Sequence, residues 1–408
     1  KWTHGYHRYP AKFIPQLVER LFDEYLPGEE GATPWQVRSV NDPFMGSGTT
    51  IVSALARGLH ASGTDVNRIA FLMTQVKAAP IEPQYLEAKL KAFRHRLGRG
   101  SAEQAGIAPV IPQRHAARID HWFREEEKLK LGRILAAIRQ EADERVQRFL
   151  LLAFSNILKP CSIWSQDSTK PARDFRKQPL DPDLAIERQL ARMQKGNRAY
   201  YEAMPEHVRR DPGAYLSLAA GDARQQPVPR ESVDLVVTSS PYVTSYEYAD
   251  LHQLSTIWLD LADDLSEYKR AFIGTAYKQC DGHALSTRTA RRIVPAMAER
   301  SLSMAREIEA FFRDMQEVIE ESFRILKPGG RACYVIGNTR LKGVDILNAE
   351  VFGESMLSVG FALDRVIKRE IPSKILPQTR DARSGRFAPT RQADNHAYPC
   401  EYIVIGRK

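Results

Sequence analysis

The stretch Asp42 to Thr50, DPFMGSGTT, most constrains the fold, because a short apolar strand, Val37 to Val40, runs directly into its glycine-rich turn. An amphipathic helix is predicted after the turn from the spacing of Ile51, Val52 and Leu55. Glycines let a ligand approach the backbone closely, and the first amides of a helix have no intrahelical partner. Strand, turn and helix therefore predict a site for a polar or anionic ligand group in an α/β fold.

A second strand, Ala61 to Gly63, is predicted to end at Asp65. Asp65 lies about twenty residues after the turn, where doubly wound folds place a carboxylate for ribose hydroxyls. No lysine follows the turn glycines, so an ATP-type phosphate loop is disfavoured. The pattern predicts a nucleoside ligand with a short polar tail.

The stretch Val233 to Tyr248, VDLVVTSSPYVTSYEY, begins as an apolar, β-branched strand and continues into a polar, aromatic turn. Such a run is typical of a parallel strand that is buried on both faces. Ligands of open α/β sheets bind beyond the carboxyl ends of the strands, so chemistry is expected at this turn. Taken alone, the stretch also fits a strand that ends in an ordinary Ser-Pro turn.

Further strands are expected at 215–220, which ends at Asp222, and at 331–337, 361–369 and 401–406. Helices are expected at 251–261, 304–326 and 347–360, and Lys327 to Gly330 is a strong helix stop. Residues 264–300 are polar and poorly periodic. Between residues 72 and 212 the α/β pattern stops, and helices are expected at 85–97, 116–138, 141–158 and 184–207.

The chain is thus expected to divide into 1–71 with the ligand motifs, a mainly helical insert at 72–212, and 213–408 with the catalytic turn. Within the insert, the loop 159–177 alternates basic, hydroxyl and aromatic residues, a composition that suits phosphate contact and base stacking. Its candidate DNA contacts are Lys170, Arg173, Arg176 and Lys177. A solvated loop whose Trp164 and Phe175 pack against the helices is the open alternative.

The composition is that of a globular protein, with 408 residues, 43% hydrophobic and 27% charged. No apolar run approaches the roughly 20 residues of a membrane span, and no signal-peptide pattern is present, so a cytoplasmic, nucleoid-associated protein is expected. The net charge of +9 is compatible with a polyanionic partner. The four cysteines are widely separated, and neither a metal site nor a disulfide framework is expected.

The pairing of DPFMGSGTT with a later TSSPY turn resembles the S-adenosylmethionine-dependent DNA amino-methyltransferases, which methylate N4 of cytosine or N6 of adenine. HRYPAKF is similar to the N-terminal cofactor motif of that family, LKPGG to the start of its fifth strand, and EYIVIGRK to its closing strand. The resemblance covers most of the chain outside the insert. It implies a Rossmann-like class I methyltransferase sheet, mostly parallel with an antiparallel last strand.

The resemblance also implies roles for residues. Asp65 would hold the ribose of S-adenosylmethionine, and Asp222 its adenine amino group. The methionine part would be surrounded by Lys12, Phe13, Asp42, Phe44, Gly46, Gly48 and Thr49.

Ser239, Ser240, Pro241 and Tyr242 would form the catalytic turn. The Ser239 hydroxyl and the Ser240 carbonyl would accept hydrogen bonds from the target amino group, while Tyr242 stacks on a base flipped out of duplex DNA. The family usually has proline where this chain has Ser240, so the substitution Ser240→Pro is expected to keep or raise activity. Serine at position 239 favours N4 of cytosine over N6 of adenine.

Three alternatives differ from this interpretation. An RNA methyltransferase of the guanine-N2 type carries a similar cofactor turn. A DNA-binding regulator without catalysis would not need both turns together. A carbon-5 cytosine mechanism needs a thiolate, but Cys400 opens an apolar run and is interpreted as a core strand cysteine. Arg288 to Arg292 and the loop 374–391 are further candidates for reading the DNA sequence, and a restriction endonuclease is a candidate partner.

Overall fold

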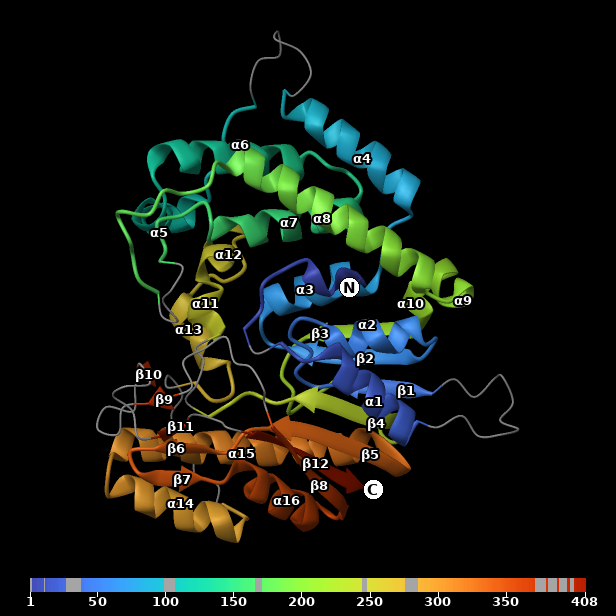
Figure 1. Cartoon of the computed structure of the whole chain (residues 1–408), viewed down its shortest axis with the longest axis vertical. Helices are drawn as coiled ribbons and strands as arrows, with labels where there is room; N and C mark the ends of the chain where they lie inside the picture. The colour runs from blue at the N-terminus through green and yellow to red at the C-terminus, as the bar shows by residue number, and fades with distance from the viewer. Residues whose placement is uncertain are drawn as a thin grey trace.

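The computed structural model describes residues 2–10, 12–26, 38–98, 107–165, 171–243, 248–275, 285–370, 379–380, 387–388, 395–396 and 400–408. Seven strands form one sheet in the spatial order β3-β2-β1-β4-β5-β12-β8 (Figure 1). In that order the strands are β3 Leu216–Ala220, β2 His60–Asp65, β1 Ser39–Asp42, β4 Val233–Ser239, β5 Leu326–Ile336, β12 Cys400–Arg407 and β8 Ala362–Glu370.

The pairs from β3 to β5 are all parallel, whereas β12 runs antiparallel to both β5 and β8. The last strand of the chain is therefore inserted between the fifth strand and the edge strand. This arrangement confirms the predicted Rossmann-like class I methyltransferase sheet with an antiparallel last strand.

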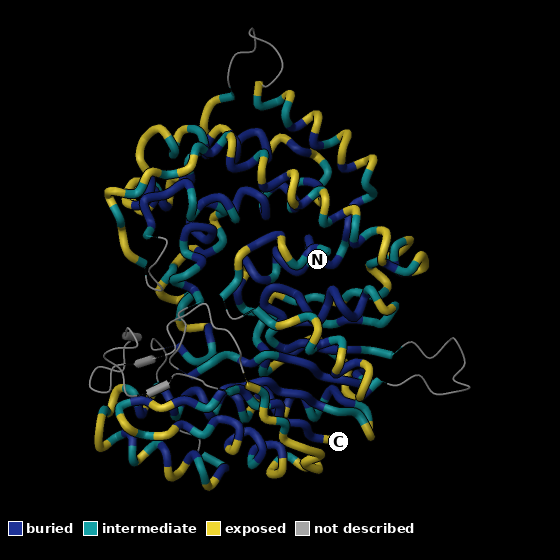
Figure 2. The backbone as a smooth tube through the Cα atoms, viewed as in Figure 1, coloured by how far each residue is buried: buried dark blue, intermediate teal, exposed yellow. Residues whose placement is uncertain are grey.

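Two helical layers cover the sheet because the central strands are apolar on both faces. On β4, Leu235 and Val237 share a core with Val18 of α1 (Pro15–Tyr25) and Ile51 of α2 (Thr49–Ala56). The intervening Val236 belongs to a second core. That core includes helices α14 (Arg288–Ala298), α15 (Leu302–Ile325) and α16 (Asn348–Val359). Figure 2 shows the buried segments concentrated along the strands and the inner faces of these helices.

The helical insert packs as a separate layer on α3 (Arg68–Ala78), the helix that follows β2 (Figure 1). Its core also takes in α12 (Gln253–Trp258), which follows the catalytic turn. The insert helices are α4 Pro83–Arg96, α5 Ala116–Trp122, α6 Glu125–Arg139, α7 Glu144–Leu158, α8 Pro182–Ala203, α9 Glu206–Arg210 and α10 Pro212–Tyr215. The remaining short elements are η1 Trp2–Gly5, η2 Gln113–His115, α11 Tyr248–Leu251, α13 Leu265–Arg270, β6 Thr339–Leu341, β7 Val344–Ile346, β9 Thr379–Arg380, β10 Phe387–Ala388 and β11 Asn395–His396.

Several expected boundaries are wrong. The helix expected at 116–138 is two helices, because Phe123 is extended and three glutamates, Glu125 to Glu127, start a new helix at its favourable N-terminus. The helix expected at 251–261 breaks at His252. Residues 264–300, expected to be irregular, contain α13 and α14. No helix in the described part of the chain combines the length and the apolar composition needed to span a membrane.

Strand β5 begins at Leu326 rather than at Arg331, so the Lys327 to Gly330 stop lies inside a strand. The register with β4 shifts there, between Val233 and Leu235. A Cβ on Gly330 would lie 3.0 Å from the carbonyl oxygen of Asp234, which is closer than ordinary contact. Glycine at this position therefore lets the irregular start of β5 approach β4.

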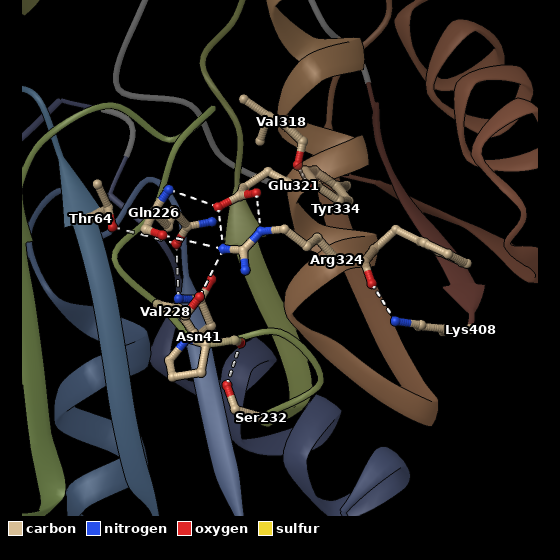
Figure 3. A network of polar contacts seen from close by, with 12 residues as sticks. Asn41, Thr64, Gln226, Val228, Ser232, Val318, Glu321, Arg324, Tyr334 and Lys408 are labelled. Carbon is tan, nitrogen blue, oxygen red and sulfur yellow. Dashed lines mark hydrogen bonds and ion pairs between the residues drawn. The ribbon is translucent and has the colours of Figure 1, made fainter.

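A buried polar network ties α15 to the connection between β3 and β4 (Figure 3). The Glu321 carboxylate accepts a hydrogen bond from the backbone N–H of Gln226 at 2.8 Å and another from Arg324 Nε at 2.6 Å. Arg324 also donates to the carbonyl of Val228 at 2.8 Å, and Asn41 of β1 donates to the Gln226 side chain at 3.0 Å. The network fixes the segment that leads from Asp222 into β4.

We expect Glu321→Ala to lower the free energy of unfolding by about 2–4 kcal/mol, because it leaves the buried Gln226 N–H without its acceptor and removes the carboxylate that pairs with Arg324. Urea unfolding measures this change. The control is Glu320→Ala at an exposed position on the same helix, which should change stability by less than about 0.5 kcal/mol. Equal effects of the two substitutions would contradict a structural role for the network.

Candidate functional site

A cleft of about 800 Å³, counted to its open mouth, lies at the carboxyl ends of the central strands. The cleft brings together residues from HRYPAKF, the glycine-rich turn, the strand ends at Asp65 and Asp222, and the predicted catalytic turn. Those that line it are Lys12, Phe13, Asp42, Phe44, Gly46, Thr49, Asp65, Asp222, Ser239 and Pro241. Gly48, Ser240 and Tyr242 are not among the lining residues.

Asp42, the last residue of β1, ties that strand to β4. Its Oδ1 accepts a hydrogen bond from the Thr238 hydroxyl at 2.7 Å and from the backbone N–H of Phe44 at 3.1 Å. Burial raises the pKa of Asp42 to about 6, although these bonds favour the charged form. The carboxylate thus holds the turn after β1 against the strand that carries Ser239.

Asp65, the last residue of β2, ties that strand to the same turn. Its Oδ2 accepts a hydrogen bond from the Gly46 N–H at 2.8 Å, and its Oδ1 accepts one from the Asn67 N–H at 2.8 Å. Burial raises the pKa of Asp65 to about 7, and the nearby charge of Asp42 adds to the shift. A carboxylate has about four acceptor positions, so Asp65 keeps capacity for a ligand hydroxyl.

The glycines of the turn serve the protein's own packing. Gly46 and Gly48 both have positive φ, +46° and +75°. A Cβ on Gly48 would lie 2.7 Å from Thr74 Oγ1 of α3, and one on Gly46 would lie 3.1 Å from the Tyr9 ring. The Gly48 N–H bonds to the Met45 carbonyl at 2.6 Å. The amides of Gly46 and Gly48 are therefore bonded within the protein, to Asp65 and Met45.

The N-terminal segment closes one side of the cleft. The Phe13 carbonyl accepts a hydrogen bond from the Thr49 hydroxyl at 3.4 Å, and the Lys12 ammonium donates to the His4 carbonyl. Burial lowers the pKa of Lys12 to about 8. Behind the turn, the fully buried Lys77 donates to the Ser47 carbonyl at 2.8 Å, which supports the turn from α3.

An aromatic stack on the cleft wall was not predicted from the sequence. The Tyr9 ring stacks with both Tyr248 and His252, with centroid distances of 5.9 Å and 5.2 Å. Buried His252 contacts the Asn67 side chain at 3.1 Å through Nδ1, and burial lowers its pKa to about 4. His252 therefore packs as a neutral ring. Tyr9 lies within the HRYPAKF motif, whereas Phe272, which also lines the cleft, had no sequence signal.

Asp222 follows β3 and is held by Arg224. The guanidinium donates to both carboxylate oxygens, with Nη2 at 2.6 Å from Oδ2 and Nε at 3.0 Å from Oδ1. Arg224 also bonds to Asp314 of α15 at 2.7 Å. These bonds fix the orientation of Asp222 at the cleft. The role of Arg224 was not predicted.

Ser240, which replaces the expected proline, fastens the catalytic turn to β5. Its backbone N–H and its hydroxyl both donate to the Val335 carbonyl at 3.2 Å. The side chain is 2% exposed. Hydrogen bonding thus supplies the rigidity that a second proline would give by fixing φ. Tyr242 packs partly buried against the core of α15 and β5 rather than in the cleft.

Arg173, Arg176 and Lys177, three of the candidate DNA contacts of the insert, are not among the residues that line the cleft. Lys170 lies outside the described residues. The Lys177 ammonium donates to the carbonyls of Lys159 at 2.9 Å and Trp164 at 2.7 Å, so it holds the loop together. Arg173 and Arg176 are exposed, whereas Trp164 is buried in the insert core.

The other two candidates for reading the DNA sequence are the segment Arg288 to Arg292 and the loop 374–391. Arg288, Arg291 and Arg292 are exposed on α14, and most of the loop 374–391 lies outside the described residues.

Among the described residues, no three His, Cys, Asp or Glu side chains are grouped to hold a metal ion. Cys161 and Cys333 are buried, and burial raises the pKa of the Cys161 thiol to about 12. Cys400 lies in β12, as expected for a strand cysteine.

The chain is similar over almost its whole length to type II methyltransferases. It is 26% identical to M.MvaI of Kocuria varians over 423 residues, which cover 99% of this chain and 90% of that protein. It is 21% identical to M.BsoBI of Geobacillus stearothermophilus over 419 residues, covering 85% and 77%. A shorter match, 34% identical over 105 residues, relates 24% of the chain to 18% of M.MjaII of Methanocaldococcus jannaschii. No family model matches the chain.

Solved structures with a similar fold give low scores. A candidate DNA modification methylase of Thermus thermophilus, complexed with S-adenosyl-L-methionine, has a TM-score of 0.25 and 21% identity over 46% of this chain and 53% of that one. The rRNA methyltransferase aviRa of Streptomyces viridochromogenes has a TM-score of 0.32 and 10% identity over 98% and 88%. Scores this low carry no functional argument.

The sheet order is that of the class I methyltransferase fold, and the residues of the predicted cofactor motifs line one cleft in it. The whole-length similarity to type II methyltransferases confirms the resemblance to the S-adenosylmethionine-dependent DNA methyltransferases, with S-adenosylmethionine as cofactor.

The expectation that Ser240→Pro would be tolerated is revised. Proline cannot donate either hydrogen bond to Val335, so we expect Ser240→Pro to lower the free energy of unfolding by about 1–3 kcal/mol. Ser240→Ala keeps the backbone N–H and should cost only about 0.5–1.5 kcal/mol. Urea unfolding of both variants measures the difference, and a proline variant as stable as the unmodified protein would contradict this role of Ser240.

Proposed function

We propose that the protein transfers a methyl group to the exocyclic N4 of cytosine in double-stranded DNA, on a base flipped out of the helix. The observation that carries this proposal is the cleft in which Ser239 and Pro241 of the catalytic turn lie with Asp42 and Asp65 of the cofactor motifs. A turn that follows a buried strand and shares a cleft with a nucleoside site can present an acceptor to a second substrate.

The residues fit S-adenosylmethionine. Asp65 would accept the ribose hydroxyls, and Asp222, oriented by Arg224, would accept the adenine amino group. The methionine part would lie against the turn 44–49 and the closing segment with Lys12 and Phe13. When bound, this cofactor supplies an electrophilic methyl group.

The catalytic turn would prepare the target nitrogen. The lone pair of an exocyclic amino group is conjugated into the ring, so the nitrogen is a poor nucleophile. Acceptors around its two hydrogens favour tetrahedral geometry and free the lone pair. The Ser239 hydroxyl and the Ser240 carbonyl would be these acceptors, and the half-buried Tyr242, which packs outside the cleft in the ligand-free protein, would turn its ring onto the flipped base. The bonds from Ser240 to Val335 support this proposal because they hold the turn rigid before the base arrives.

Serine at position 239 favours N4 of cytosine as the methylated atom, and N6 of adenine is the second candidate for that atom. The similarity to type II methyltransferases supports duplex DNA as substrate over RNA, and it makes a restriction endonuclease of matching specificity a proposed partner. In this proposal the helical insert and the exposed Arg173 and Arg176 contribute to DNA binding.

Nucleoside mass spectrometry of DNA incubated with the protein and labelled cofactor tests this function. We expect N4-methylcytosine. Ser239→Ala should lower the rate about 100-fold by removing one acceptor, with little change in cofactor affinity. N6-methyladenine would select the second candidate. Label found only in tRNA would contradict a DNA substrate.

We expect the affinity for S-adenosylhomocysteine to fall about tenfold between about pH 8 and pH 6. The reason is that the charged Asp65 carboxylate accepts ribose hydroxyls better than its protonated form, and its pKa is about 7.

The stability of the ligand-free protein changes in the opposite direction, because it rises as the pH falls. A raised carboxyl pKa stabilises the fold fully below the unfolded value of about 4, and this stabilisation is lost as pH rises through about 7.

Calorimetric titration across this pH range measures the affinity. Asp65→Asn should weaken binding and flatten its dependence on pH near 7. Asp364→Asn, which removes a carboxylate paired with Arg331 away from the cleft, is the control and should leave both unchanged. A steep pH dependence in Asp65→Asn would assign the titration to another group.

A further inference from the structure

Phe175 is the most exposed large apolar side chain among the described residues, with 67% of its surface accessible. It lies in the loop between α7 and α8 of the insert. Single exposed apolar residues are common on protein surfaces, so exposure alone assigns no role. The surroundings of Phe175 separate it from such cases.

The backbone around Phe175 is held in place on both sides. The Arg124 guanidinium donates to the carbonyls of Phe175 at 3.2 Å and Lys177 at 3.0 Å. The Asp174 N–H bonds to the Ile163 carbonyl at 2.8 Å. We call the segment Arg173 to Lys177 the Phe175 knuckle. Because its backbone is fixed, the ring is presented to solvent with little conformational entropy left to lose on binding.

Two arginines flank Phe175 in sequence. The Arg173 guanidinium lies over the Phe175 ring, 4.9 Å from its centre, and Arg176, the next residue after Phe175, is exposed. His121 of α5 lies within the field of Arg173 and Arg118, which lower its pKa after the larger effect of burial. An aromatic face bordered by guanidinium groups matches the stacked bases and flanking phosphates of a nucleic acid.

The Phe175 knuckle is joined rigidly to the region that follows the catalytic turn. The Ile163 N–H bonds to the Trp122 carbonyl at 3.0 Å, and the rings of Trp122 and Trp164 stack at 4.8 Å. Phe123, the residue after Trp122, packs edge-on against Trp258 of α12, with 5.5 Å between the ring centres. Helix α5 packs against α12, one of the helices that follow β4 (Figure 1).

We propose that Phe175 stacks on a base of the bound DNA duplex between phosphate contacts of Arg173 and Arg176. This proposal rests on the proposed DNA methylation. It assigns Lys177 to holding the Phe175 knuckle rather than to DNA. Apolar side chains that enter a duplex unstack base steps, and this favours extrusion of a neighbouring nucleotide into the catalytic cleft.

The test measures binding of a short fluorescein-labelled duplex, taken from a plasmid site that the unmodified protein methylates, at several salt concentrations. Phe175→Ala should bind about tenfold or more weakly with an unchanged salt slope, because stacking releases no counterions. Phe175→Trp, which keeps an aromatic ring, should bind the duplex with the affinity of the unmodified protein. Arg176→Gln should reduce the salt slope by about one.

Leu184→Ala is the matched control, since Leu184 is 60% exposed on α8 of the same insert. It should bind the duplex normally. Thermal unfolding midpoints of all variants should agree with that of the unmodified protein, which separates binding from folding. If Phe175→Ala binds as tightly as Leu184→Ala while the duplex is still methylated, the stacking role of Phe175 is wrong and the proposed function stands. A protein that binds and methylates tRNA but not the duplex would overturn both.

Discussion

Two buried carboxylates hold the catalytic edge of the sheet together. Asp42 joins the end of β1 to Thr238 of β4, and Asp65 joins the end of β2 to the Gly46 amide in the turn after β1. Burial raises the pKa of both groups, so the fold accepts an energetic cost in order to place acceptors at this edge. Every other part of the site is positioned relative to the strand ends that these two side chains connect.

Around this edge, hydrogen bonds within the protein hold the site rigid before any ligand binds. One pair of them takes the place of the expected proline. The Gly46 and Gly48 amides bond internally, and Arg224 fixes Asp222. Ser240 uses both of its donors on Val335 where a proline was expected. A site that is rigid before binding loses less entropy when substrate and cofactor arrive, which suits a reaction that depends on aligning a weak nucleophile.

The helical insert is coupled to the sheet through α3 and α12 rather than attached at its ends alone. Its core includes Trp258, from the helix after the catalytic turn, and packs against Phe123 beside the Phe175 knuckle. The insert surface that we propose to contact DNA is therefore held at a fixed position relative to the turn after β4. In the proposed reaction, this rigidity would help to match the contacted DNA to one flipped base.

Local sequence was enough to predict the sheet strands, the glycine turn, Asp65 at its spacing and the catalytic turn at the end of β4, because each of these depends on periodicity and short-range geometry. Most of the site residues that the resemblance to the DNA methyltransferases implied also line one cleft. Packing alone decided the stack of Tyr9 on Tyr248 and His252, the clamp of Arg224 on Asp222, the two hydrogen bonds of Ser240 to Val335, and the structural use of Lys177. These contacts join segments that are distant in sequence or depend on side-chain direction, and neither composition nor spacing specifies which partner a polar group meets once the chain is packed.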